Sequence, residues 1–229
     1  MKRSQVNDII RAGDDFIRSF GFILPHFAYW SPGQMRDRVA EIGGILGARL
    51  GWDITDYGQG KYEELGLFLF TVRNGSEEDL RRGGGMCYAE KIMISQQDQV
   101  SPLHRHVVKA EDIINRGGGV LALKLYNSDA QGNIDKTSQV EVATDGLLRR
   151  QDPGAILRLH PGESVTLMPG NWHAFWGEGG DVLVGEVSTV NNDLTDNIFA
   201  DPIGRFAEIE EDEPPLHLLV SDYPRWLGA

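Results

Sequence analysis

The stretch SPLHRHVVKAED, residues 101–112, contains two histidines separated by one residue and a glutamate shortly after them. Side chains alternate between the two faces of a strand, so His104 and His106 point the same way and Arg105 points the other way. Glu111 adds a carboxylate just downstream of the pair. This spacing is typical of a metal site built at the end of a strand.

A third histidine of the same kind lies farther along the chain. His173 is in MPGNWHAFW, residues 168–176, directly after a Pro-Gly turn. If it meets the first stretch, three imidazoles and one carboxylate form a set that suits Mn²⁺, Fe²⁺, Co²⁺, Ni²⁺ or Zn²⁺ and leaves room for a substrate. The sequence therefore predicts a metal centre; the alternative is four ordinary polar residues at strand ends.

Composition limits the partners. The chain has 229 residues, of which 41% are hydrophobic, enough for one large domain with a real core. Its net charge of −12 argues against nucleic acid and anionic membranes as partners, because both require a basic surface. Cys87 is a single cysteine, and the polar residues after Met1 do not resemble a secretory signal. We therefore expect a cytoplasmic protein.

Residues 1–51 are expected to form a helical extension. Apolar residues recur at helical spacing from Val6 to Phe20. Ser31-Pro32-Gly33-Gln34 then offers an N-cap serine, a proline at the first helical position and a glutamine three residues after the cap. An apolar stripe predicts one helix that continues to a stop near Gly51. The members of the stripe are Met35, Val39, Ile42 and Leu46.

Residues 52–190 change to short strands separated by Gly and Pro turns, as in a sandwich or a closed jelly-roll barrel. The strand candidates are 65–72, 86–94, 119–126, 139–143, 156–159, 164–168 and 181–190. Residues 191–229 lose this pattern, and we expect them to pack on the barrel or close over it. They contain an acidic cluster, Glu208 to Glu213, interpreted as a solvated loop, with a lid or a subunit contact as the alternative.

Residues 101–119 and 159–176 resemble the two signature motifs of the cupin superfamily. The first motif is H-x-H, a short gap, Glu and then Gly; the second is Pro-x-x-x-His. Here the second reads Pro169-Gly170-Asn171-Trp172-His173, a slight departure from the common form that affects the turn and leaves the ligand in place.

The resemblance is closer still to the D-lyxose isomerases within the cupins. It rests on LHRHVVKAEDIINRGGG, GDVLVGEVSTVNND and IGRFAEIEEDEPP. It implies a mainly β fold, the cupin double-stranded β-helix or jelly-roll barrel, with the N-terminal helices packed beside it. It also implies Mn²⁺ as the metal, with Co²⁺, Fe²⁺, Ni²⁺ or Zn²⁺ as substitutes, and a homodimer. The implied reaction interconverts free D-lyxose and D-xylulose, and D-mannose and D-fructose.

Such an isomerase needs a base in addition to the metal. A proton next to the sugar carbonyl must be removed and returned to the adjacent carbon, through an enediolate that the metal stabilises. Metal ligands are poor bases, so a second carboxylate is required. We predict Glu186, because it is an ionisable residue among apolar neighbours on a predicted strand. Burial is expected to raise its pKa; the alternative is a solvent-facing glutamate.

Three cations complete the predicted catalytic set. Lys109 lies between two predicted ligands and is expected to bind a sugar hydroxyl or steady the oxyanion. Lys91 is in the middle of a predicted strand, and Arg205 is expected to close over the sugar from the C-terminal region. The alternatives are an exposed lysine, a lysine that extends to the surface, and an ion pair with the acidic cluster.

Other functions fit parts of this pattern. Three histidines and a glutamate can also hold Fe²⁺ in a cupin dioxygenase, although buried lysines are unusual beside O₂ chemistry. A sugar-phosphate isomerase is disfavoured by the acidic composition. A barrel that binds sugar and metal without catalysis is the non-enzymatic alternative.

Overall fold

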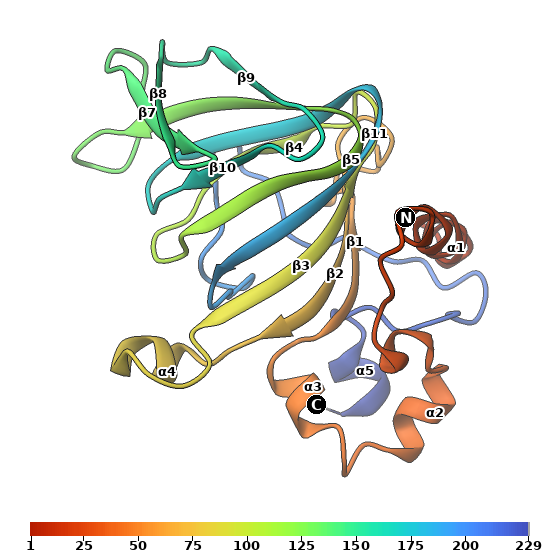
Figure 1. The fold of residues 1–229 in the computed structure, drawn as a ribbon. Helices are drawn as coiled ribbons and strands as arrows, with labels where there is room; N and C mark the ends of the chain where they lie inside the picture. Colours follow the sequence, from red (N-terminus) through yellow and green to blue (C-terminus); the bar gives the residue numbers. More distant parts are fainter. Residues whose placement is uncertain (229) are drawn as a thin grey trace.

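The computed structural model describes residues 1–228, and an antiparallel sheet folded into a barrel dominates it (Figure 1). The strands are β1 Gly51–Thr55, β2 Leu67–Asn74, β3 Tyr88–Ser95, β4 Ser101–Arg105, β5 Glu111–Ser128, β6 Ile134–Asp135, β7 Val140–Thr144, β8 Leu147–Gln151, β9 Ile156–Leu159, β10 Ser164–Leu167, β11 Trp172–Thr189 and β12 Ile198–Phe199. Their main order is β1-β2-β3-β11-β5-β10-β7-β8; β4 pairs with β11 and β12, and β6 and β9 pair with β5. The mainly β barrel predicted from the sequence is therefore confirmed.

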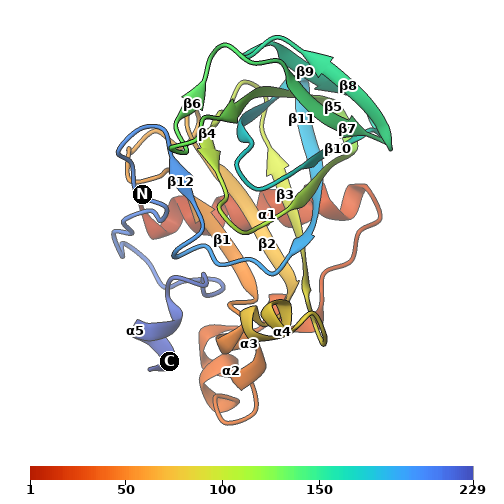
Figure 2. The same cartoon turned by 90° about the vertical axis from the view of Figure 1, so that its left-hand side faces the viewer.

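The helices lie outside this barrel. They are α1 Arg3–Ser19, the 3-10 helix η1 His26–Tyr29, α2 Pro32–Asp37, α3 Gly43–Gly47, α4 Glu77–Arg82 and α5 Tyr223–Leu227. Figures 1 and 2 show α1 across the outer face of β1 to β3, and α2, α3 and α5 grouped near one end of these strands. No helix within residues 1–228 is long and apolar enough to cross a membrane.

Two long strands build both walls of the barrel. β5 and β11 have 18 residues each and pair with one another along most of their length. The first half of β11 also pairs with β4, and its second half pairs with β3. The pairing shifts between Glu178 and Val182, where both strands bend. The sequence predicted only one half of each strand, residues 119–126 and 181–190.

The chain packs two apolar layers around this sheet. Along β2, Leu67 and Leu69 face the barrel interior, while Phe68 and Phe70 face the helical side. Phe68 and Phe70 pack there with Val6, Ile10 and Ile17 of α1. Each such buried side chain contributes about 1.5–3 kcal/mol relative to exposure, so α1 is an integral part of the fold.

The predicted helix after Ser31 is only partly correct. Ser31 and Gln34 form the expected capping box at the start of α2. The helix ends at Asp37, however, and Val39 of the predicted stripe is 41% exposed. A run of turns leads into α3, where adjacent glycines favour helix weakly. Gly51 does not stop a helix but begins β1.

Most of the acidic cluster is exposed, as expected of a solvated loop, but Glu211 is half-buried and pairs with the first helix. Glu211 accepts two hydrogen bonds at 2.9 Å from the fully buried guanidinium of Arg3, which Asp222 also contacts at 2.8 Å. Asp212 accepts the backbone N–H of Ser4 at 2.9 Å. These contacts therefore hold the C-terminal segment against the start of α1, although the two are more than 200 residues apart in the sequence.

Candidate metal centre

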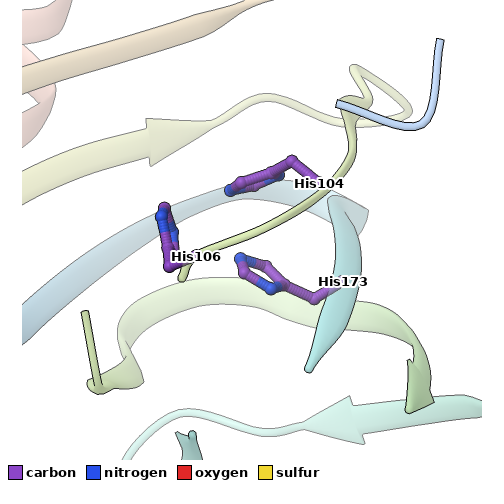
Figure 3. Close-up of side chains that lie close together, drawn as sticks. All are labelled: His104, His106 and His173. Carbon is purple, nitrogen blue, oxygen red and sulfur yellow. The ribbon is translucent and has the colours of Figure 1, made fainter. Parts of the chain in front are cut away.

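Three imidazole rings converge inside the barrel (Figure 3). His104 lies in β4, and His106 follows the end of that strand. His173 is the second residue of β11 and pairs with His104 across the ladder. One ring nitrogen of each histidine lies within 4.8 Å of the others. His106 and His173 are buried, and His104 is half-buried.

The hydrogen bonds of the rings leave their inner nitrogens free. Nδ1 of His104 and Nδ1 of His173 lie 2.8 and 3.2 Å from the carbonyl oxygen two residues earlier in the chain. Nδ1 of His106 lies 2.7 Å from the carbonyl oxygen of Asp196. A carbonyl only accepts, so each Nδ1 carries the proton and each Nε2 offers a lone pair.

Glu111 supplies the oxygen of the predicted ligand set. Its Oε1 lies 3.1 Å from Nε2 of His173 and 3.4 Å from Nε2 of His106. This buried oxygen has no hydrogen-bond partner among residues 1–228, an arrangement that costs about 1–3 kcal/mol if nothing else binds there. The Nε2 lone pairs of the three histidines and the unsatisfied Oε1 of Glu111 therefore lie close together inside the barrel. This set of donors suits a divalent cation.

The charges of these groups suit a cation as well. Burial, together with the two neighbouring rings, holds the pKa of His104 well below its usual value, so the ring is neutral. Burial alone would raise the pKa of Glu111, but the ammonium of Lys109 outweighs it and holds that pKa well below its usual range. Metal ligands must be deprotonated, and these groups already are.

Two lysines flank Glu186 beside the histidines. Nζ of Lys109 lies 2.7 Å from Oε2 of Glu111 and 2.9 Å from Oε1 of Glu186. Nζ of Lys91 lies 3.5 Å from the same oxygen of Glu186. All of these side chains are buried, so neither lysine is exposed and Glu186 does not face solvent.

The expected direction of the Glu186 pKa is wrong in this structure. Burial does favour the protonated carboxyl, as we argued from the sequence. The charges of Lys109 and Lys91 outweigh burial, however, and the pKa of Glu186 is lowered. Lys109 was predicted to bind a sugar hydroxyl or steady the oxyanion, and Lys91 was predicted without a specific role. The effect of the two lysines on the pKa of Glu186 was not anticipated.

Arg205 reaches the same cavity but does not pair with the acidic cluster. Its Nη2 lies 2.8 Å from Oδ2 of Asp53 and 3.4 Å from Oδ1 of Asp193. Its Nη1 is buried and has no hydrogen-bond partner in the described part of the chain. Two carboxylates therefore hold the guanidinium of Arg205 in place, and its Nη1 can donate a hydrogen bond to a ligand.

These groups line one cavity inside the barrel. It is lined by all eight predicted site residues: His104, His106, Lys109, Glu111, His173, Lys91, Glu186 and Arg205. Three further residues were not predicted from the sequence: Tyr57 and Asp193, which also line this cavity, and Asp53, which pairs with Arg205. Asp53 is a charged residue inside an apolar strand, as Lys91 is. The same pattern that pointed to Lys91 could therefore have identified Asp53.

Comparisons with known proteins find sugar isomerases that match all or nearly all of the chain. The sequence model of the D-lyxose isomerase family matches residues 1–223. A D-lyxose/D-mannose isomerase of Serratia proteamaculans is 46% identical over 232 residues, with 100% of each chain covered. A second D-lyxose/D-mannose isomerase, from Escherichia coli O157:H7, is 44% identical and covers 97% of this chain and 98% of its own.

Solved structures agree on the fold. An L-ribose isomerase of Acinetobacter sp. DL28 superposes with a TM-score of 0.61 at 14% identity, covering 92% of this chain and 98% of its own. An L-ribose isomerase of Cellulomonas parahominis gives a TM-score of 0.57 at 14% identity, with the same two coverages. This shared architecture confirms the predicted cupin-type barrel.

Proposed function

The chain belongs to the D-lyxose isomerase family, as its motifs predicted, and we propose that it interconverts D-lyxose with D-xylulose and D-mannose with D-fructose. It is an aldose–ketose isomerase, which removes the dioxygenase and the non-catalytic barrel from consideration. The observation that carries the proposal is one buried cavity lined by both the histidine cluster and a separate carboxylate, Glu186.

His104, His106, His173 and Glu111 would hold a divalent cation, and we propose Mn²⁺; Co²⁺, Fe²⁺, Ni²⁺ and Zn²⁺ suit the same donors. Such a cation acts as a Lewis acid that polarises the sugar carbonyl. The protein's own contribution is to bring these side chains together, with Glu111 ionised and the His104 ring neutral, before the cation arrives. Glu111 is further fixed by the ammonium of Lys109 at 2.7 Å.

Glu186 acts as the base. It removes the proton from C2 of the aldose and returns it to C1, while a hydroxyl proton passes from O2 to O1. Lys109 contacts both Glu186 and Glu111, so it lies between the base and the metal ligands. From there its ammonium can stabilise negative charge as it develops on the sugar oxygens.

Lys91 and Arg205 bind the hydroxyl groups farther along the sugar. Each is already paired with carboxylates: Lys91 with Glu186 and Asp193, and Arg205 with Asp53 and Asp193. Little positive charge is therefore left over for a phosphate, which favours an unphosphorylated sugar. The homodimer and the cytoplasmic location stay predictions.

The proposal is tested with purified protein stripped by chelator and reloaded with Mn²⁺. The protein is incubated with D-lyxose and with D-mannose while D-xylulose and D-fructose are measured. We expect both ketoses with Mn²⁺ and neither without it. Absence of both products in protein that retains bound Mn²⁺ would refute the proposed substrates. Deuterium from solvent should appear in the product, because a proton is transferred rather than a hydride.

A further inference from the structure

The three histidines are not supported in the same way. His104 and His173 each donate Nδ1–H to a carbonyl only two residues away, so the chain just before each ring orients it. His106 donates to the carbonyl of Asp196, 90 residues farther along the chain. The direction of its Nε2 therefore depends on where the segment that contains Asp196 is held.

Asp196 is held by the loop that carries His106. Its Oδ1 accepts the backbone N–H groups of Val107 at 2.7 Å and Val108 at 3.0 Å, and its Oδ2 accepts that of Lys109 at 2.9 Å. The residue is 7% exposed. One aspartate thus contacts the ring of a predicted metal ligand through its carbonyl and the backbone of a predicted catalytic lysine through its carboxylate.

We propose that Asp196 is the positioning residue that orients His106 toward the metal and places Lys109 between Glu111 and Glu186. The inference rests on the proposed metal centre and isomerase function. Asp196 does not line the cavity within the described chain, so it acts through these two residues rather than on the sugar.

The chemistry of the three N–H groups explains why a carboxylate is needed. An ionised carboxylate only accepts hydrogen bonds, and here both oxygens face donors. An asparagine of the same shape has one oxygen and one NH₂ group. Whichever way it turns, the NH₂ faces at least one backbone N–H. Asp196→Asn therefore breaks at least one contact and weakens the attachment that holds the Asp196 carbonyl beside His106.

Metal affinity measures this effect directly. Partners of metal-ligating histidines typically change affinity or activity by about 10–100-fold when altered. We therefore expect Asp196→Asn to weaken Mn²⁺ binding by about 10–100-fold, measured from free Mn²⁺ by electron paramagnetic resonance. At saturating Mn²⁺, we also expect kcat for D-lyxose to fall more than KM rises, because Lys109 is displaced.

Asp145→Asn is the matched control. Asp145 also accepts hydrogen bonds in a turn, from the backbone N–H and the hydroxyl of Ser164, but it does not line the cavity within the described residues. It should leave Mn²⁺ affinity and kcat unchanged. A lower melting temperature of Asp196→Asn with Mn²⁺ affinity within twofold of the unaltered chain would mean a merely structural role and would overturn the inference.

A second measurement needs no substitution. In metal-free protein with ¹⁵N-labelled histidine, His106 should carry its proton on Nδ1, the tautomer that the Asp196 carbonyl requires. A proton on Nε2 of His106 would contradict the inference even if Asp196→Asn does not fold. If the unaltered chain binds no Mn²⁺, the metal part of the proposed function fails, and the tautomer alone then decides the role of Asp196.

Discussion

Glu186, the proposed base, lies among charges that must change before it can accept a proton. It lies 2.9 Å from Nζ of Lys109 and 3.5 Å from Nζ of Lys91, and both charges lower its pKa. A general base works best when its pKa is near the operating pH. A sugar that draws the two ammonium groups onto its own oxygens would remove this effect and leave burial, which raises the pKa. We therefore expect the substrate itself to activate Glu186.

The substitution Glu186→Gln tests whether Glu186 is the base. The amide keeps the shape but cannot take a proton, so kcat for D-lyxose should fall about 10²- to 10⁴-fold. Mn²⁺ affinity should stay within a few-fold, since Glu186 is not a proposed ligand. Glu178→Gln is the control, because Glu178 is in the same strand but pairs at the surface with Arg158. Normal turnover by Glu186→Gln would remove it as the base.

The residues of the site differ in how visible they were in the sequence. His104, His106, Glu111 and His173 have motif spacing, and Glu186 and Lys91 are charges inside apolar strands. Asp196 has neither signal. It acts through backbone N–H groups and its own carbonyl, and such contacts exist only after two distant segments have met.

At the scale of elements, β5 and β11 bend together where their pairing shifts. Gly118 lies there with φ +96°, and a Cβ at this position would overlap the carbonyl oxygen of Asp181. A glycine is therefore required for both conformation and space. Glycines in sequence also suggest a loop, and the sequence predicted only one half of each strand. The hydrogen-bonded ladder continues past the bend because β5 and β11 bend together.

Gly118→Ala should destabilise the fold. The unfavourable φ alone costs about 1–3 kcal/mol, and the overlap with Asp181 adds to it. For a chain of this size each kcal/mol lowers the melting temperature by roughly 2–4 °C. Gly44→Ala in α3 is the control, since a Cβ there meets no atom of the described chain within 4 Å. Equal melting temperatures for the two variants would contradict the requirement for glycine at the bend.

At the scale of the whole molecule, ion pairs join the two ends of the described chain. Hydrogen bonds from Arg3 are the main cause that lowers the pKa of Glu211 below its usual value of 4.5. A lowered carboxylate pKa stabilises the fold above the unfolded pKa, and this contribution is lost as the pH falls through the folded pKa. Stability should therefore decline below about pH 4.5 as Glu211 is protonated.

Urea unfolding at pH 6 and at progressively lower pH measures this contribution. Glu211→Gln should be less stable than the unaltered chain at pH 6, because Arg3 is buried and loses a charged partner. The difference should shrink as the pH falls through the folded pKa of Glu211. Asp145→Gln is a control outside this junction. A difference between the Glu211 variant and the unaltered chain that does not change with pH would contradict the linkage.

The proposed cation would connect these scales, because its ligands come from β4, β5 and β11 and meet only in the folded barrel. A ligand that binds only the folded state stabilises it by about 2.7 kcal/mol at a concentration 100 times Kd. Thermal unfolding in Mn²⁺ should therefore occur about 5–10 °C higher than in chelator. His173→Ala should lose most of this shift, whereas His160→Ala, at an exposed position outside the cavity-lining residues described, should keep it. A shift that persists in His173→Ala would place the stabilising cation elsewhere, because a site deprived of one of its three imidazoles cannot keep the same affinity for the folded state.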